Sequence, residues 1–159
     1  VRARTMGFVL QDGGLLPYLT VRENALLAAE LAGHPKGHDN AGHITHIAGL
    51  IGIGGLLDQL PARLSGGERQ RAAVLRGLAP RPQILLADEP TAALDPETAG
   101  EVLEMLVRTA DSFGATIIMV SHNAPLARTF GFEIRTLETV ESCSEKSSTL
   151  HLAAVEEMS

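Results

Sequence analysis

Residues 64–100 read LSGGERQRAAVLRGLAPRPQILLADEPTAALDPETAG, and this stretch decides the fold class. It predicts a helix over 66–78 that two prolines stop, because proline lacks a backbone N–H and clashes with the preceding turn. The continuous apolar run at 84–87 predicts a buried strand, and Asp95, in the cap position before a proline, predicts a second helix. Helix, buried strand and helix in this order are typical of an α/β domain.

The flanking sequence repeats the pattern. Apolar runs at 6–10 and 116–120 predict two more buried strands, and a T-x-x-E capping box predicts a helix over 20–31. Residues 34–63 indicate only short helices and loops. Continuous apolar strands between amphipathic helices indicate a parallel sheet that is covered on both faces.

Composition narrows the class of protein. The chain has 159 residues, a net charge of -6 and only 3% aromatic residues, so it lacks the basic patch and stacking platform of nucleic-acid binders. Its only cysteine, Cys143, cannot form an internal disulfide, which suits a reducing compartment. The longest apolar stretch, 47–57, is about half the length that a bilayer requires. We therefore expect a cytosolic domain that does not bind nucleic acid.

Polar side chains follow each of the three predicted strands. Gln11 follows the first, Asp88 and Glu89 follow the second, and His122 follows the third. Parallel strands bring their carboxyl ends to one edge of the sheet, where α/β sheets bind ligands. Asp88 is suited to hydrated Mg²⁺ and Glu89 to orienting or deprotonating a water, although an acidic turn that only caps the strand would look the same.

The segment Ser65, Gly66, Gly67, Glu68 predicts an anion-binding site. Ser65 and Glu68 have capping-box spacing, which by itself indicates only a well-started helix. Two glycines in a first helical turn cost about 1 kcal/mol each, and they make sense where a ligand approaches the backbone closely. Exposed N–H groups, a hydroxyl and the positive helix end favour phosphate.

These motifs together resemble the ABC transporter ATP-binding family. LSGGERQR at 64–71 resembles the signature motif, ILLADEP at 84–90 the Walker B segment, and ALD at 93–95 the D-loop. Gln11 is similar to the Q-loop glutamine and His122 to the switch histidine. The five motifs occur in the family's order.

The resemblance implies a P-loop NTPase-like α/β core and a nucleotide site that uses ATP and Mg²⁺. In it, Glu89 would be the catalytic carboxylate and His122 would hold the γ-phosphate. Gln11 would contact Mg²⁺ and the attacking water, and Asp88 would bind Mg²⁺. These four residues are the expected catalytic and metal-binding set.

The resemblance also implies a head-to-tail dimer of two ATP-binding subunits. Ser65, Gly66, Gly67 and Glu68 would contact the nucleotide that the opposite subunit binds. Asp95 would connect the two sites across the dimer.

A transmembrane permease subunit is the second implied partner, and residues 15–33 resemble the region that receives it. The chain would then lie in the cytoplasm against the inner face of the cell membrane. The sequence of this segment is similar to that of the lipoprotein-releasing and macrolide-exporter ATPases. The implied parts are a core strand with the Q-loop (1–14), a helical signature subdomain (15–79), the remaining core (80–132) and a tail (133–159).

One family motif is missing from these residues. A P-loop requires G-x-x-x-x-G-K-[ST], and neither Lys36 nor Lys146 stands in that pattern. We expect a truncated sequence or a partial gene product, and we expect that the isolated chain does not hydrolyse ATP. Two alternatives stay open: a non-catalytic fragment that binds or regulates a transporter, and a soluble ABC ATPase that acts on DNA or ribosomes, although 12–64 has no heptads.

Two other groups of residues have simpler interpretations. The histidines at 34, 38, 43 and 46 are expected on the solvated surface rather than around a metal. The arginines of the signature helix, Arg69, Arg71 and Arg76, are expected to form surface salt bridges.

Overall fold

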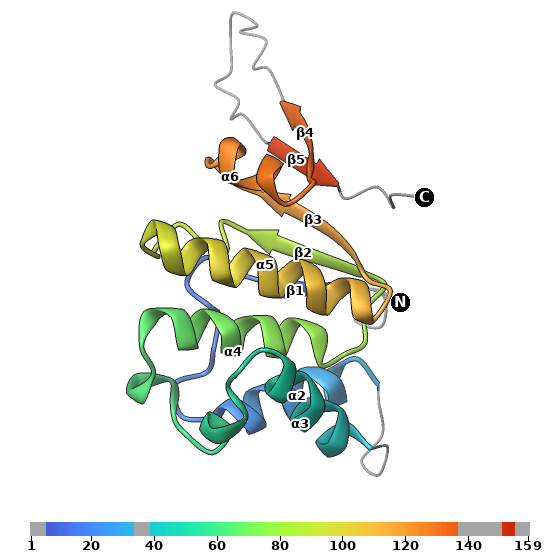
Figure 1. The fold of residues 1–159 in the computed structure, drawn as a ribbon. Helices are drawn as coiled ribbons and strands as arrows, with labels where there is room; N and C mark the ends of the chain where they lie inside the picture. Colours follow the sequence, from blue (N-terminus) through green and yellow to red (C-terminus); the bar gives the residue numbers. More distant parts are fainter. Residues whose placement is uncertain (1–5, 34–38, 137–150, 155–159) are drawn as a thin grey trace, which may run out of the picture.

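The computed structural model describes residues 6–33, 39–136 and 151–154, which form one five-stranded sheet and the helices around it (Figure 1). The strands, in their order across the sheet, are β1 (Met6–Val9), β2 (Ile84–Asp88), β3 (Thr116–Val120), β5 (His151–Ala154) and β4 (Glu133–Thr136). The first three are parallel, whereas β5 runs antiparallel to both β3 and β4. The three predicted strands are confirmed, but the sheet is mixed rather than wholly parallel. The tail segments 137–150 and 155–159 lie outside the described residues.

The helices pack in layers below and in front of the sheet, except the short last helix, which packs beside β4 (Figure 1). They are α2 (Val21–Leu31), α3 (Asn40–Leu50), α4 (Gly66–Leu78), α5 (Pro96–Ser112) and α6 (Ala124–Thr129), with short 3₁₀ turns at Gly54–Leu56 and Pro61–Arg63. Helix α5 lies across the sheet, and α4 lies between the sheet and the pair α2 and α3. None of these helices is long and apolar enough to cross a membrane.

Three helices begin where their capping residues predict. Thr20 and Ser65 each complete a capping box with the glutamate three residues later, and Asp95 accepts a hydrogen bond from the backbone of α5. These side chains satisfy backbone N–H groups that have no partner within the helix. The predicted starts of α2, α4 and α5 are therefore confirmed.

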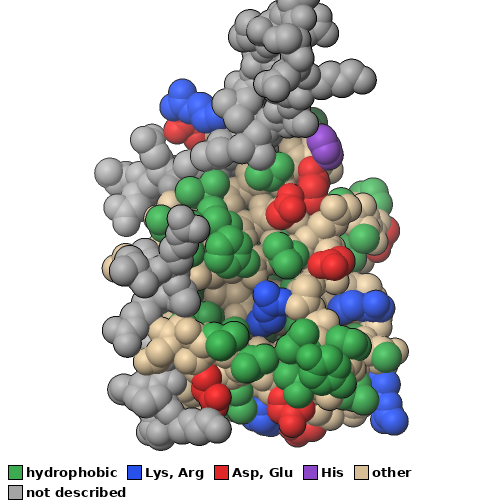
Figure 2. Space-filling model, turned by 180° about the vertical axis from the view of Figure 1, so that it is seen from behind, with side chains coloured by type: hydrophobic (Ala, Val, Ile, Leu, Met, Phe, Trp, Pro, Cys, Tyr) green, Lys and Arg blue, Asp and Glu red, His purple; other side chains and the backbone are tan. Residues whose placement is uncertain are grey.

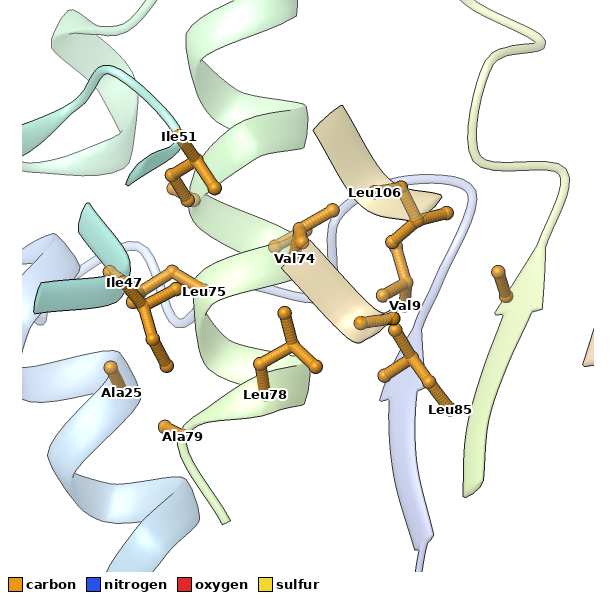
Figure 3. Close-up of a cluster of buried hydrophobic side chains, with 14 of the residues drawn as sticks. Val9, Ala25, Ile47, Ile51, Val74, Leu75, Leu78, Ala79, Leu85 and Leu106 are labelled. Atoms are coloured by element: carbon orange, nitrogen blue, oxygen red, sulfur yellow. The ribbon is translucent and has the colours of Figure 1, made fainter. Parts of the chain in front are cut away.

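Helix α4 contributes to two packed layers (Figure 3). Val74 points toward the sheet side, where Leu106 and Val9 lie, and Leu75 points toward Ile47 and Ala25 on the other side. All six side chains are almost completely buried. Because one helix serves both layers, its position fixes the helical region relative to the sheet.

The two faces of strand β1 are covered differently. Val9 is fully buried beneath the helices, whereas its neighbour Phe8, on the opposite face, is 46% exposed. Figure 2 shows hydrophobic side chains on the face opposite α5. The prediction of a sheet covered on both faces is thus wrong for β1 within the described residues. An apolar run indicates that a strand can be buried on both faces, but it does not supply the second covering layer.

Candidate functional site

The predicted site residues at the strand ends share one edge of the sheet. Val9 pairs with Ala87, and Ala87 pairs with Met119, so the three parallel strands end at the same level. Gln11 and Glu89 each lie two residues beyond these paired positions. The β2 and β3 strand ends and the first turns of α4 and α5 lie on the same side of the molecule, at the left in Figure 1.

Glu89 and His122 are in contact at this edge. Glu89 Oε1 lies 3.4 Å from His122 Nε2, and the Glu89 N–H donates to the carbonyl of Val120 at 2.9 Å. The Glu89 side chain is only 12% exposed, whereas that of His122 is 88% exposed. Figure 2 shows a histidine and acidic side chains gathered along the margin where the strands end.

The backbone and the carboxylate of Glu89 are both unusual. Its φ of 44° lies in the left-handed region, which costs a non-glycine residue about 1–3 kcal/mol and is found most often at functional sites. Its Oε1 atom is buried and accepts no hydrogen bond within the described part of the chain. A buried carboxylate oxygen ordinarily has hydrogen-bond partners, so Glu89 is prepared to accept one from a ligand or a water.

The residues beside Glu89 fit a magnesium ion. The exposed carboxylate of Asp88 ends β2, and Gln11 follows the neighbouring strand. Carboxylate and amide oxygens are ligands that Mg²⁺ accepts, and it usually keeps several waters with only one or two protein carboxylates. In the described ranges no three His, Cys, Asp or Glu side chains form a metal cluster.

The predicted anion-binding segment, Ser65 to Glu68, lies at the start of α4, and we call it the phosphate seat. The N–H and the hydroxyl of Ser65 both donate to Glu68 Oε2 at 2.8 Å, and the Glu68 N–H donates to Ser65 Oγ at 3.3 Å. The N–H and then the hydroxyl of Ser65 lower the pKa of Glu68. In this conformation the Glu68 carboxylate therefore occupies the donors of Ser65 that a phosphate would use.

Asp95 caps α5 and is held by Thr98, a residue that the sequence interpretation missed. The Thr98 N–H donates to Asp95 Oδ1 at 3.1 Å. The hydroxyl and then the N–H of Thr98 lower the pKa of Asp95. The position of Thr98, three residues after a cap, would have indicated the contact, because the glutamates of the capping boxes stand at the same position.

The arginines of α4 hold neighbouring segments. Arg71 forms the predicted kind of ion pair, with its Nη2 atom 3.0 Å from Glu101 Oε2 on α5. Arg69 and Arg76 instead donate to the backbone carbonyls of Leu64 and Gly14. The salt-bridge prediction is confirmed for Arg71. Arg69 holds the backbone just before α4, and Arg76 holds the backbone of the turn that follows Gln11.

Two of the histidines pack against an aromatic ring. The rings of His43 and His46 lie edge-on to Phe113, with centroid distances of 5.2 and 6.1 Å. His43 is half-buried, so the expectation of a purely solvated cluster is wrong for this residue. His34 and His38 lie outside the described residues.

Comparison with known proteins shows what the chain is similar to. Residues 2–92 match the family model described as "ABC transporter". The methionine import ATP-binding protein MetN of Cupriavidus necator is 38% identical over 85% of this chain and 39% of its own length. The lipoprotein-releasing system ATP-binding protein LolD of Geobacter metallireducens is 40% identical over 86% of this chain and 60% of its own length.

Solved structures show the same likeness. MJ0796, described as a bacterial ABC transporter cassette in dimeric form, superposes with a TM-score of 0.67 and 34% identity over 84% of this chain. A second structure of MJ0796 represents a post-hydrolysis state bound to ADP and Pi, with the same TM-score. The chain spans 59% of that protein, so it spans less than two thirds of each relative reported.

Proposed function

The chain belongs to the ABC transporter family of ATP-binding domains, and on that premise we propose that it is part of a subunit whose ATP hydrolysis drives transport. The observation that carries the proposal is Glu89, with a buried carboxylate oxygen that has no hydrogen-bond partner among the described residues. That oxygen lies 3.4 Å from an exposed histidine, at the edge of the sheet where α/β proteins bind ligands.

At this edge each side chain has a distinct task. Glu89 orients the attacking water and accepts its proton, while His122, which is exposed, donates to an oxygen of the γ-phosphate. Asp88 and the side-chain oxygen of Gln11 would hold Mg²⁺. A bound Mg²⁺ neutralises the charge that develops on the phosphate oxygens. Catalysis of this kind is mainly positioning and electrostatic stabilisation, which suits a site on rigid strand ends.

The phosphate seat at the start of α4 serves a nucleotide held by a second subunit in a head-to-tail dimer. Ser65 and Gly66 are exposed and Gly67 is half-buried, so a ligand on another molecule can reach this segment once Glu68 releases the donors of Ser65. Glu68 lies beside that ligand, and Asp95 connects the two sites. The dimeric form of the similar protein MJ0796 supports this arrangement.

A membrane-spanning permease is the other proposed partner. The relatives are named for methionine import and for lipoprotein release, so their cargoes differ although their ATP-binding parts are similar to this chain. We propose that the chain lies on the cytoplasmic face of the membrane and that the permease chooses the cargo.

The proposal is tested by ATP turnover. The 159-residue chain contains no P-loop sequence, so on its own it should release no phosphate from ATP in the presence of magnesium. The natural protein, expressed with any in-frame P-loop sequence upstream of Val1, should hydrolyse ATP. Glu89→Gln in that protein should lower kcat on the order of 10²-fold or more, because the amide cannot accept the proton.

The matched control is Glu104→Gln, which changes an exposed glutamate on α5 that pairs with Arg108 and leaves the strand ends untouched. It should keep full turnover. Equal activity in the Glu89 and Glu104 variants would show that Glu89 is not the catalytic carboxylate. Sustained ATP turnover by the isolated chain would show that hydrolysis does not need a P-loop outside these 159 residues.

A further inference from the structure

We propose that Thr98 is a positioning residue that ties the phosphate seat at the start of α4 to Asp95 at the start of α5. The inference rests on the proposed function, because it concerns how the seat and Asp95 keep a fixed separation within one chain. The two segments are about 30 residues apart in sequence, and α4 and α5 bring them side by side.

Thr98 lies between the two segments: it is hydrogen-bonded to Asp95, and its methyl group lies close to Gly67. Its N–H donates to Asp95 Oδ1 at 3.1 Å, and its hydroxyl and then its N–H lower the pKa of that carboxyl. Its methyl carbon, Cγ2, lies 3.0 Å from the place that a Cβ atom on Gly67 would occupy. A methyl group on Gly67 would therefore be crowded by a neighbour in its own chain, independently of any ligand that approaches it, and Thr98 would have to shift by a few tenths of an ångström.

Other residues in or beside the two helices also lie close together. A Cβ atom on Gly66 would lie 3.7 Å from Leu94 Cδ2, and one turn further along α4 Arg71 pairs with Glu101 at 3.0 Å. Threonine suits the central position, because β-branched side chains have few rotamers in a helix and so act as stiff spacers. If a bound phosphate displaced the seat, Thr98 would therefore move Asp95 as well.

The contact itself is tested in the isolated chain by its unfolding midpoint in urea. Gly67→Ala should lower the midpoint in the wild-type background, because the added methyl group meets Thr98 Cγ2. In the Thr98→Ser background, which keeps the hydroxyl and removes Cγ2, the same change should leave the midpoint unchanged or raise it. In the Thr98→Val background, which keeps the methyl, it should still lower the midpoint.

Gly100→Ala is the control for helix propensity. Gly100 is a glycine within α5 with no atom within 4 Å of an added Cβ, so the change should raise the midpoint in all three backgrounds. If Gly67→Ala behaves like Gly100→Ala in the wild-type background, Thr98 does not contact the seat and the proposal fails.

The positioning role is tested in the natural protein by separating kcat from KM. Thr98→Ser removes the methyl group beside Gly67, and Thr98→Val removes the hydroxyl beside Asp95. Each should lower kcat for ATP about 10-fold while KM stays unchanged, because catalysis is sensitive to small misplacements. Thr45→Ser, at an exposed position on α3, should change neither parameter.

The outcomes separate this inference from the proposed function. A protein that hydrolyses ATP with the same kcat in both Thr98 variants refutes the positioning role and leaves the function standing. A natural protein with a P-loop that does not hydrolyse ATP refutes the proposed function, while the urea experiment still decides whether Thr98 contacts Gly67.

Discussion

At the scale of single residues, two glycines set how closely α4 approaches the sheet. A Cβ atom on Gly7 of β1 would lie 2.1 Å from the carbonyl oxygen of Gly77 and 2.9 Å from Leu85 Cδ1. A Cβ atom on Gly77 would in turn lie 3.0 Å from the carbonyl oxygen of Phe8. The close backbone contact requires glycine on both sides and determines where the signature helix lies relative to the strand ends.

Gly7→Ala should therefore destabilise the chain strongly. The nearest atom is backbone and cannot rotate away, so helix and strand must separate, and we expect a loss of about 3 kcal/mol in the free energy of unfolding. Urea unfolding followed by circular dichroism measures it. Gly49→Ala is the control, since Gly49 lies in α3 with open space around an added Cβ, and it should stabilise by about 0.5–1 kcal/mol. A loss below about 1 kcal/mol for Gly7→Ala would contradict the close contact.

At the scale of elements, the sequence predicts helix starts well because their causes are local. Thr20, Ser65 and Asp95 bond to backbone groups only three residues away, so the residues that set each start lie within one turn. The ends are equally local where glycine follows, as at Gly33 and Gly114, which both adopt positive φ.

Two kinds of element were not predicted: a very short helix and a strand pairing between distant segments. Helix α6 has only six residues, too few to show a periodic pattern, although Asn123 caps it. The antiparallel pairing of β5 with β3 joins segments more than 30 residues apart and has no turn motif between them. The contact of Glu89 with His122 was expected from parallel strand ends, but the positive φ of Glu89 and its burial depend on packing that sequence periodicity does not encode.

The helix caps also predict how stability changes with pH. The pKa values of Glu23, Glu68 and Asp95 are lowered by hydrogen bonds at the starts of α2, α4 and α5, and that of Asp58 by its hydrogen bond with Arg22. A carboxyl with a lowered folded pKa binds fewer protons in the folded state than in the unfolded state. Its contribution is therefore complete above the ordinary values of 4.5 for Glu and 3.8 for Asp, and it is lost as the pH falls through the folded pKa.

We expect the urea midpoint to change little between pH 7 and about pH 5 and then to fall as the pH decreases toward about 3. The double variant Glu23→Gln, Glu68→Gln keeps an oxygen acceptor at each cap and removes the titration, so its midpoint should fall less over the same range. Equal pH dependence in the variant and the wild type would show that these two caps do not control acid stability.

At the scale of the whole molecule, motifs with fixed spacing made the strand-end residues predictable. Each of Gln11, Glu89 and His122 stands within two residues of the end of a continuous apolar run, and parallel pairing places such ends together. The contact between Thr98 and Gly67 was not predictable in this way, since it depends on how closely α4 and α5 pack. The residues at the strand ends can be predicted from the order and direction of the strands. The proximity of Thr98 to Gly67 depends on side-chain packing, which the sequence pattern does not show.

The uneven cover of the sheet gives a prediction about association. Phe8 and Val9 are neighbours on β1 and face opposite sides, and β1 is an edge strand of the described sheet. Exposed apolar side chains on an edge strand favour self-association. Phe8→Thr keeps a residue that suits a strand and removes exposed apolar surface, so it should reduce self-association of the 159-residue chain while changing the free energy of unfolding by less than about 0.5 kcal/mol.

Val9→Thr is the matched comparison on the other face. Val9 is fully buried, and a hydroxyl placed there without a partner should cost about 1–3 kcal/mol without reducing association. Sedimentation velocity at increasing protein concentration measures association, and urea unfolding measures stability. If Phe8→Thr leaves the concentration dependence of sedimentation unchanged, the open face of β1 is not the surface through which copies of the chain associate. If it lowers the urea midpoint as much as Val9→Thr does, that face is packed in solution.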